Sequence, residues 1–258
     1  MPTSPDPDRY LQLTLTRRES FTEDIAVLHV EAPEPVEFTP GQYATVGLTV
    51  DDLPRPLLRP YSVIGTPNDT HLEFYLERVD DGRLTPLLWD LEPGASLWMR
   101  RKVVGRFVLD TDVTHHVMAA TVTGVGPYVS ILRTWLSRSE PERRDDRFLV
   151  IHGGSYAREL GRYQEELTEY AATHSAIDYV PTVSRPHENP DWVGERGRVE
   201  DVLRKHWDAA GFPLDDTALY TCGHPQMIDK AQAIGQRAAL PDERIHEEKY
   251  FVERRTTA

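Results

Sequence analysis

The stretch HHVMAATVTGVGPYVSILRTWL, residues 115–136, indicates how the second half of the chain folds. It begins with HVMAATV, an apolar run of the length of a buried strand, and continues with a short turn that contains Gly124 and Gly126. Pro127 then opens a stretch with helical spacing, as proline often does in the first turn of a helix. A strand that passes through a glycine-containing turn into a helix is typical of a parallel sheet that binds a phosphate at the turn.

The residues after this stretch continue to alternate between strands and helices. Further strand-like runs are RFLVIHG, AIDYVPTVS, ALYTCG and, near the chain end, RIHEEKYFV. Runs with helical spacing alternate with them: YVSILRTWLSR, ELGRYQEELTEYAATH, RVEDVLRKHWDAAG and PQMIDKAQAIGQRAAL. This order predicts an α/β nucleotide-binding domain with a parallel sheet over residues 111–258, and ligand-binding loops at the carboxyl ends of its strands.

The residues before this stretch follow a different period. They form short alternating runs, YLQLTLTRR, DIAVLHVEA, QYATVGLTV, LLRPYSVIG, HLEFYLERV, SLWMRR and GRFVLD, separated by Gly, Pro, Asp and Asn. Strands at this spacing predict a small antiparallel barrel or sandwich. We therefore expect a two-domain chain, with an N-terminal antiparallel β-barrel over residues 1–110 followed by the α/β domain.

The composition narrows the range of functions. The chain has 258 residues and a net charge of −13, which argues against nucleic-acid binding because phosphate contacts need clustered Lys and Arg. We expect no membrane span and no signal peptide, and we place the protein in the cytoplasm, in keeping with its single cysteine, Cys222. The 10 histidines form no metal signature, and we interpret His115 and His116 as strand-edge surface.

Two segments of the first half carry side chains suited to a phosphate and a flat ring. In LLRPYSVIG, alternation places Arg59 and Tyr61 on one face of a strand and Ser62 on the other. In DDGRLTPLLWDL, Thr85 is a good helix cap, and the amides of a helix start can face an anion. Tyr75 in HLEFYLERV alternates away from the apolar residues, so we expect it to face outward, as a cross-strand partner or as a platform for a ring.

Two loops of the second half are suited to a nucleotide. TVTGVGP, residues 121–127, can present backbone amides to a pyrophosphate. YTCGHPQM, residues 220–227, repeats the strand–turn–helix pattern, with Pro225 at the helix start. Cys222 by itself is more often a small buried hydrophobe than a nucleophile.

Taken in order, these segments are far more specific than any one of them. The set Arg-x-Tyr-Ser, Gly-x-Leu-Thr-Pro, Thr-x-Thr-Gly-x-Gly-Pro, Val-Ser-Arg, Cys-Gly-x-Pro-x-Met and a C-terminal aromatic resembles the bacterial-type ferredoxin–NADP⁺ reductases. The resemblance runs from Tyr10 to the chain end. It implies an N-terminal barrel that binds FAD and a C-terminal domain that binds NADP(H).

The resemblance also assigns residues to the two nucleotides. It implies that FAD is held by Arg59, Pro60, Tyr61, Ser62, Tyr75, Arg83, Leu84, Thr85, Thr123, Tyr250 and Phe251. It implies that NADP(H) is held by Thr121, Gly124, Ser155, Arg158, Ser184, Arg185, Arg198, Cys222, Gly223 and Pro225. The catalytic parts fall to Ser62 near flavin N5, to Cys222 in the nicotinamide pocket and to Phe251 over the other flavin face.

The sequence departs from this family at three positions. Val122 replaces a glycine, so we expect either an obstructed pyrophosphate site or a left-handed backbone that costs a β-branched residue about 1–2 kcal/mol or more. Ser155 replaces an arginine for the adenosine phosphate, a role that Arg158 can take, and His224 replaces an asparagine. The FAD half therefore matches the family better than the nucleotide half.

We expect an FAD enzyme that transfers a hydride between NADPH and flavin N5 and single electrons to or from ferredoxin or flavodoxin. We also expect a monomer, on which an acidic partner lands at a basic patch formed by Arg100, Arg101, Lys102 and Arg106. Val122 and Ser155 leave open an NADH-dependent reductase that serves an oxygenase. A flavin-binding electron carrier that no longer uses a nicotinamide is the second alternative.

Overall fold

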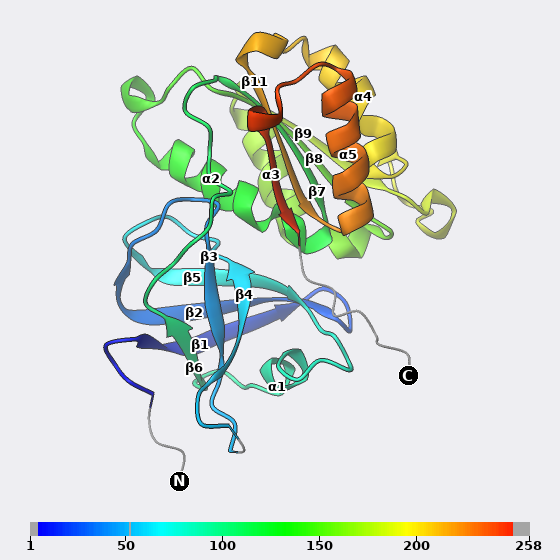
Figure 1. The fold of residues 1–258 in the computed structure, drawn as a ribbon. Helices are drawn as coiled ribbons and strands as arrows, with labels where there is room; N and C mark the ends of the chain where they lie inside the picture. Colours follow the sequence, from blue (N-terminus) through cyan, green and yellow to red (C-terminus); the bar gives the residue numbers. More distant parts are fainter. Residues whose placement is uncertain (1–4, 52, 250–258) are drawn as a thin grey trace. The chain divides into compact units, whose positions relative to one another are not determined.

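The computed structural model describes residues 5–51 and 53–249. Tyr250 and Phe251, which the family resemblance places against the flavin, lie outside the described residues. Backbone contacts divide the chain into two compact units, each built on one sheet (Figure 1). Unit 1 comprises Met1–Leu109, Gly126–Arg144 and Gly161–Tyr163, and unit 2 comprises Asp110–Val125, Asp145–Leu160 and Gln164–Ala258.

Unit 1 contains a six-stranded antiparallel sheet in the order β4-β3-β6-β1-β2-β5. An isolated bridge joins Ile64, just after β4, to Glu73 of β5, so the two edge strands meet and the sheet curls toward a barrel. This confirms the predicted antiparallel barrel. A short helix, α1 (Thr85–Trp89), follows β5. The strands are β1 (Tyr10–Ser20), β2 (Ile25–Val36), β3 (Tyr43–Leu48), β4 (Leu57–Ser62), β5 (Asp69–Glu77) and β6 (Ser96–Arg100).

The core of the barrel follows from the period of two in its strands. Leu11, Leu13 and Leu15 of β1 alternate inward and are at most 4% exposed. They pack in one cluster with Leu28 of β2 and Phe74 of β5. Because each strand contributes every second residue to this cluster, the alternating runs in the sequence fix which face of each strand is buried.

One predicted strand, GRFVLD at residues 105–110, does not form. The antiparallel pairing ends at Val104, which makes an isolated bridge with Tyr43. The next carbonyl, that of Gly105, accepts a hydrogen bond from the Gln42 side chain at 3.2 Å. A side chain rather than a neighbouring strand therefore donates the hydrogen bond to the Gly105 carbonyl, and the segment continues without pairing to a strand.

Two segments from the second half of the chain pack within unit 1. Helix α2 (Gly126–Ser137) donates a hydrogen bond from Ser130 Oγ to the Gly65 carbonyl at 2.9 Å. Glu73 of β5 accepts hydrogen bonds from the Tyr163 hydroxyl at 2.7 Å and from Arg133 at 3.2 Å. The sheet of unit 1 is thus covered partly by residues that come after residues 121–125 in the sequence.

Unit 2 contains the parallel sheet that the sequence predicts, in the order β10-β9-β8-β7-β11-β12. Every pairing in it is parallel. The two-residue strand β10 is the one element of this sheet that the apolar runs did not predict. The strands are β7 (His115–Thr121), β8 (Arg147–Gly154), β9 (Ile177–Val183), β10 (Glu195–Arg196), β11 (Thr217–Gly223) and β12 (Ile245–Lys249), and the helices are α3 (Tyr163–Thr173), α4 (Val199–Ala210) and α5 (Pro225–Arg237).

The strand order of unit 2 reverses direction at β7. The chain proceeds from β7 through β8 and β9 on one side, and it returns to β11 and β12 on the other. In open α/β sheets, ligands bind outside the carboxyl ends of the strands at such a switch point. The loops that follow β7 and β11 are therefore the expected ligand-binding loops of this unit.

The histidine pair at the start of β7 is not strand-edge surface, contrary to the interpretation from sequence. His116 is fully buried, its ring stacks on Phe148 with 5.1 Å between centroids, and its Nε2 lies 3.4 Å from Asp146 Oδ1. His115 is partly buried, with Nδ1 2.9 Å from an oxygen of Asp216. The interpretation was wrong because β7 is a central strand with a neighbour on each side.

Candidate functional site

The loops after β7 and β11 interlock at the switch point. Thr121, the last residue of β7, accepts a hydrogen bond at Oγ1 from the amide of His224 at 2.8 Å. Gly223 has φ +118°, and a Cβ there would lie 2.3 Å from Thr121 Oγ1. A Cβ on Gly124 would lie 2.4 Å from the carbonyl oxygen of Cys222. The structure thus brings together four predicted nucleotide residues, and only glycine allows the two loops to approach so closely.

Val122 lies in the turn between these residues, within a 3₁₀ segment, Val122–Val125. Its φ is +47°, in the left-handed region. Of the two outcomes expected for this valine, the structure shows the strained backbone, which costs about 1–2 kcal/mol or more for a β-branched residue. Thr123, the next residue and a predicted FAD contact, is buried at 7% exposure.

The carbonyl of Val122 has a buried partner on the neighbouring strand. Nε2 of His152, on β8, lies 2.9 Å from this carbonyl oxygen. Nδ1 of the same ring lies 3.2 Å from the Tyr179 hydroxyl on β9. Burial lowers the pKa of His152 to about 4, although the hydrogen bond to Val122 acts in the opposite direction. His152 is therefore neutral near pH 7.

The loop after β11 begins α5 in the way that the sequence predicts. Pro225 is the first residue of the helix, and His224 is the N-cap. The Nδ1 atom of His224 accepts a hydrogen bond from the Gln226 amide at 3.2 Å. An asparagine side chain caps helices through the same kind of bond, so His224 caps α5 as an asparagine at this position could. Cys222 is fully buried on β11, before this loop.

A cationic cluster forms around Tyr156 in the loop after β8. The guanidinium carbon of Arg158 lies 4.3 Å from the centre of the Tyr156 ring, and that of Arg185 lies 5.4 Å from it. The Tyr156 hydroxyl accepts a hydrogen bond from Arg185 at 2.9 Å and donates one to Glu188 at 2.8 Å. Two of the predicted NADP(H) residues therefore converge on an aromatic ring.

The other predicted nucleotide residues lie around this cluster in different ways. The Ser155 amide donates to Glu159 at 2.6 Å, so this carboxylate closes the turn before the cluster. The Ser184 amide donates to the Gly154 carbonyl at 2.9 Å and thereby joins the ends of β9 and β8. Arg198 pairs instead with Glu200, at 4.0 Å, at the start of α4.

In unit 1, the predicted FAD residues of β4 place a buried hydroxyl beside a cation. Within residues 5–51 and 53–249, the Tyr61 hydroxyl is buried and has no hydrogen-bond partner. Burial raises the pKa of Tyr61 to about 12, and the nearby Arg59 charge lowers it in part. Arg59 donates one hydrogen bond to the Leu58 carbonyl at 3.0 Å. Pro60 is exposed, and Ser62, the last residue of β4, is 7% exposed.

The turn before α1 is held by Thr85, but not as a helix cap. The Thr85 hydroxyl accepts a hydrogen bond from the Val79 amide at 2.9 Å and donates one to the Val79 carbonyl at 3.2 Å. The capping expectation was wrong, because Leu84 is the N-cap and Thr85 is the first helical residue. Leu84 is buried, whereas Arg83 is exposed. The hydroxyl therefore closes the loop around Arg83.

Tyr75 faces away from Phe74, as alternation predicts, but it is not exposed. Its ring lies 5.1 Å from that of Tyr163 and 6.1 Å from that of Phe21, and the residue is 5% exposed. The expectation that Tyr75 is exposed to solvent was wrong, because residues 161–163, which are distant in sequence, cover this face of β5.

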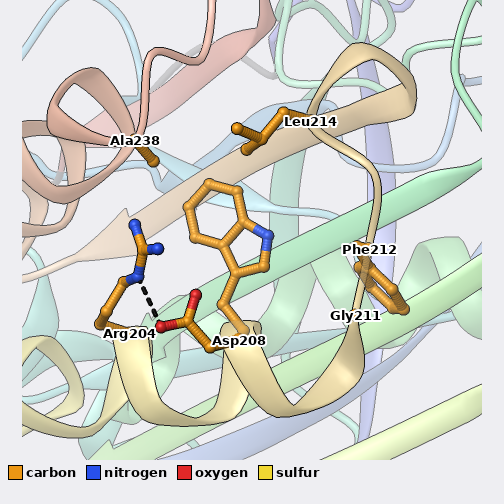
Figure 2. A pocket seen from close by; sticks show the side chains of 7 residues that line it. Arg204, Asp208, Gly211, Phe212, Leu214 and Ala238 are labelled. Carbon is orange, nitrogen blue, oxygen red and sulfur yellow. Dashed lines mark hydrogen bonds and ion pairs between the residues drawn. The ribbon is translucent and has the colours of Figure 1, made fainter.

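Two surface hollows lie apart from these loops in sequence and topology. One, of about 290 Å³, is lined by Trp207, Phe212 and Leu214, beside an Arg204–Asp208 pair at 2.8 Å (Figure 2). It lies where α4 ends and the chain returns to the start of β11, so it is at the amino ends of the strands. The other, of about 220 Å³, lies in unit 1 and is lined by Asp8, Arg9, Tyr10, Arg100, Arg101 and Lys102.

Sequence reasoning missed His152, Tyr156 and Glu188. Each is an ordinary residue in its own segment, and its partners come from other strands or loops. Of these three residues, only Tyr156 had a local signal. It follows Ser155, where the family resemblance expects an arginine, and an aromatic ring can orient a nearby arginine such as Arg158. Within the described residues, no helix is long and apolar enough to cross a membrane and no group of side chains is arranged to hold a metal ion.

Comparisons with known proteins find relatives among the ferredoxin reductases. Residues 118–233 match the oxidoreductase NAD-binding domain family. The chain is 32% identical over 214 residues to ferredoxin--NADP reductase of Azotobacter vinelandii, an alignment that covers 76% of this chain and 77% of that protein. It is 25% identical to the ferredoxin--NAD(P)(+) reductase component of the naphthalene 1,2-dioxygenase system of Pseudomonas putida, over 95% of this chain and 70% of that protein.

A solved structure has the same fold. The ferredoxin NADP+ reductase from Neisseria gonorrhoeae with bound FAD and NADP superposes with a TM-score of 0.78 at 20% identity, over 94% of this chain and 99% of that one. At this identity the likeness shows the two-sheet fold alone.

Proposed function

Because the chain belongs to the ferredoxin–NADP reductase family, we propose that it is an FAD-dependent oxidoreductase that transfers a hydride between NADP(H) and flavin N5 and exchanges single electrons with ferredoxin or flavodoxin. The observation that carries the proposal is the pair of interlocked loops at the switch point of the parallel sheet. There Gly124 and Gly223 let two strand–helix turns approach closely, at the carboxyl ends of the strands where such sheets bind a dinucleotide.

The residues of unit 1 fit an FAD. Bound FAD supplies a centre that takes two electrons together and returns them singly. The buried Tyr61 hydroxyl, which has no partner within residues 5–51 and 53–249, is suited to a polar group of this cofactor. Arg59 and Arg83 are assigned to the FAD phosphates, and the Ser62 hydroxyl to the edge at N5. Pro60, Tyr75, Leu84 and Thr85 shape these contacts from the same strands and turn.

The residues of unit 2 fit an NADP(H) with its adenosine at the loop after β8. Arg158 and Arg185 both lie over the Tyr156 ring, so two cations and an aromatic face are available to a phosphate and an adenine. The position of Arg158 supports the idea that it takes over from the arginine absent at Ser155. Thr121, Gly124, Cys222, Gly223 and Pro225 are assigned to the rest of the nucleotide, with Ser184 and Arg198 at its margin.

A second candidate function is an NADH-dependent reductase that serves an oxygenase. The observation that favours it is Glu188, whose carboxylate lies 3.6 Å from Arg185 and therefore competes with a 2′-phosphate for this cation. The resemblance to the naphthalene dioxygenase reductase component also favours it. Two arginines at the Tyr156 ring favour NADPH instead.

The electron partner is proposed to be an acidic ferredoxin or flavodoxin. Arg9, Arg100, Arg101 and Lys102 line a hollow in unit 1 and give a local positive surface on a chain with a net charge of −13. Arg101 is partly neutralised by an ion pair with Glu34. Local charge of this kind raises the rate of encounter more than the affinity. The protein is proposed to act as a cytoplasmic monomer.

Anaerobic stopped-flow spectroscopy tests the proposal. The purified protein should be yellow, and NADPH should bleach the flavin faster than NADH at equal concentration. Equal rates or faster bleaching by NADH would favour the oxygenase reductase. If the flavin stays oxidised with both nucleotides, the protein is a flavin-binding electron carrier that does not use a nicotinamide. A colourless protein that takes up no added FAD would refute both candidate functions.

A further inference from the structure

The left-handed turn at Val122 is tied to the centre of the parallel sheet by one side chain. The carbonyl oxygen of Val122 lies 2.9 Å from Nε2 of His152, and His152 is fully buried on β8. β8 is the direct neighbour of β7, the strand that ends in this turn. The most strained residue of the nucleotide turn is therefore held by a group in the rigid interior.

Geometry determines the protonation of the His152 ring. A carbonyl oxygen can only accept a hydrogen bond, so Nε2 carries the proton. In the neutral ring Nδ1 is then an acceptor, and the Tyr179 hydroxyl at 3.2 Å is placed to donate to it. Both ring nitrogens have a partner of the right kind only in this tautomer. Because burial keeps the ring neutral near pH 7, both hydrogen bonds can persist at that pH.

The hydrogen bond sets the direction of the peptide group that follows Val122. In a trans peptide the carbonyl and the next amide point in opposite directions. The carbonyl of Val122 is directed at His152, so the amide of Thr123 is directed away from β8. Val122 can leave its left-handed conformation only by rotation about φ, which also reorients this carbonyl, so the hydrogen bond to His152 opposes that change.

We propose that His152 is a positioning residue for the nucleotide turn: its hydrogen bond holds the Val122 peptide in the orientation that accepts the pyrophosphate of NADP(H). This inference rests on the proposed function, because it assigns the turn to a pyrophosphate. It is specific to this chain, since a glycine at position 122 adopts the left-handed conformation without help and depends less on the restraint.

Calorimetric titration of the FAD-loaded protein with two ligands tests the inference. NADP⁺ contains the pyrophosphate, whereas adenosine 2′-monophosphate contains only the part assigned to Arg158 and Arg185. His152→Leu removes the donor at similar volume, and we expect roughly tenfold weaker NADP⁺ binding with unchanged binding of adenosine 2′-monophosphate. His152→Gln retains an N–H donor at a similar reach, and we expect it to restore NADP⁺ binding to within about twofold of the wild type.

The same substitutions in a Val122→Gly background separate positioning from general damage. We expect His152→Leu to weaken NADP⁺ binding by no more than about twofold there, because glycine needs no restraint. Equal losses in both backgrounds would overturn the inference. So would an equal loss of both ligands, unchanged NADP⁺ binding by His152→Leu, or a His152→Gln variant as weak as His152→Leu.

Nitrogen NMR of the wild-type histidines gives a readout that needs no nucleotide and no variant. We expect His152 to be neutral at pH 7 with its proton on Nε2. A ring protonated on Nδ1, or charged at this pH, would overturn the inference even if His152→Leu fails to fold. Wild-type protein that binds no NADP⁺ would refute the proposed function, and the tautomer would then decide alone whether His152 holds the turn.

Discussion

Glu188→Gln should make the protein more selective for NADP(H). The Glu188 carboxylate accepts a hydrogen bond from the Tyr156 hydroxyl at 2.8 Å and lies 3.6 Å from an Arg185 nitrogen. A 2′-phosphate that binds Arg185 must displace this carboxylate or tolerate its charge. Glutamine has the same shape and can still accept the tyrosine hydrogen bond, so the substitution removes the charge and little else.

The size of the effect follows from the exposure of the pair. The side chains of Arg185 and Glu188 are 52% and 42% exposed, so their ion pair is of the surface kind, worth about 0.2–1 kcal/mol. Release of Arg185 from this pair should therefore tighten NADP⁺ binding about 1.5- to 5-fold. Binding of NAD⁺, which has no 2′-phosphate, should not change. The gain should shrink as salt is raised, because exposed charges are screened over roughly 10 Å at 0.1 M.

Titration calorimetry with NADP⁺ and NAD⁺ at two salt concentrations measures this effect. Asp191→Asn is the matched control, because it removes an equal charge from an exposed position three residues further along the same loop. If Asp191→Asn tightens NADP⁺ binding as much as Glu188→Gln does, the effect is one of net charge and the contact with Arg185 is irrelevant. Equal tightening of NAD⁺ would show that the cluster does not meet the 2′-phosphate.

Four further predictions test other parts of the chain. Tyr61→Phe should leave the thermal stability of FAD-free protein unchanged or higher, because it removes a buried hydroxyl without a partner in the described part of the chain. Fluorescence titration of the same variant should show roughly fivefold weaker FAD binding. Val122→Gly should raise the melting temperature by relieving left-handed strain and leave the NADPH dissociation constant within about twofold of the wild type, because His152 already holds the Val122 peptide; Ala239→Gly, at another left-handed position (φ +65°), should also raise the melting temperature without changing that constant. The pKa of His152 is lower in the folded protein than in the unfolded one, so the unfolded state takes up the proton first as pH falls. The free energy of unfolding should therefore fall by up to about 3 kcal/mol between pH 6.5 and pH 4. Denaturant melts of His152→Gln should lack this loss. Arg100→Glu should slow reduction of an acidic ferredoxin at low salt without changing the rate at which NADPH bleaches the flavin.

Periodicity in the sequence predicts the two sheets because each period reflects a local geometry. Alternation by two gave the buried face of β1, and apolar runs separated by helical spacing gave the order of the parallel strands. Contacts between segments distant in sequence have no such local signal. His116 is buried because β7 is central, and Tyr75 is covered because residues 161–163 return to β5, and neither fact can be seen within the segment itself.

The candidate site shows the same division. The glycines and the threonine of the two loops were assigned through the family resemblance, and the structure shows the reason for these residue types: the two backbones approach each other closely. The role of Glu188 was not, since any exposed acid on a loop looks alike in sequence. The conformation of Val122 was one of two stated outcomes, and sequence had no means to choose between them, because the choice depends on whether a partner for its carbonyl exists on β8.

The three departures from the family pattern each have a local compensation in unit 2. The strain at Val122 is met by the hydrogen bond from His152, the arginine absent at Ser155 by the stacking of Arg158 on Tyr156, and the asparagine absent at His224 by a histidine that caps the same helix. The helix cap and the hydrogen bond to Val122 also stabilise the fold, whereas the two arginines at the Tyr156 ring place cations where a nucleotide phosphate can reach them. These two arginines therefore weigh against the carrier that no longer uses a nicotinamide, and the remaining choice, NADPH or NADH, lies at Arg158, Arg185 and the competing carboxylate of Glu188.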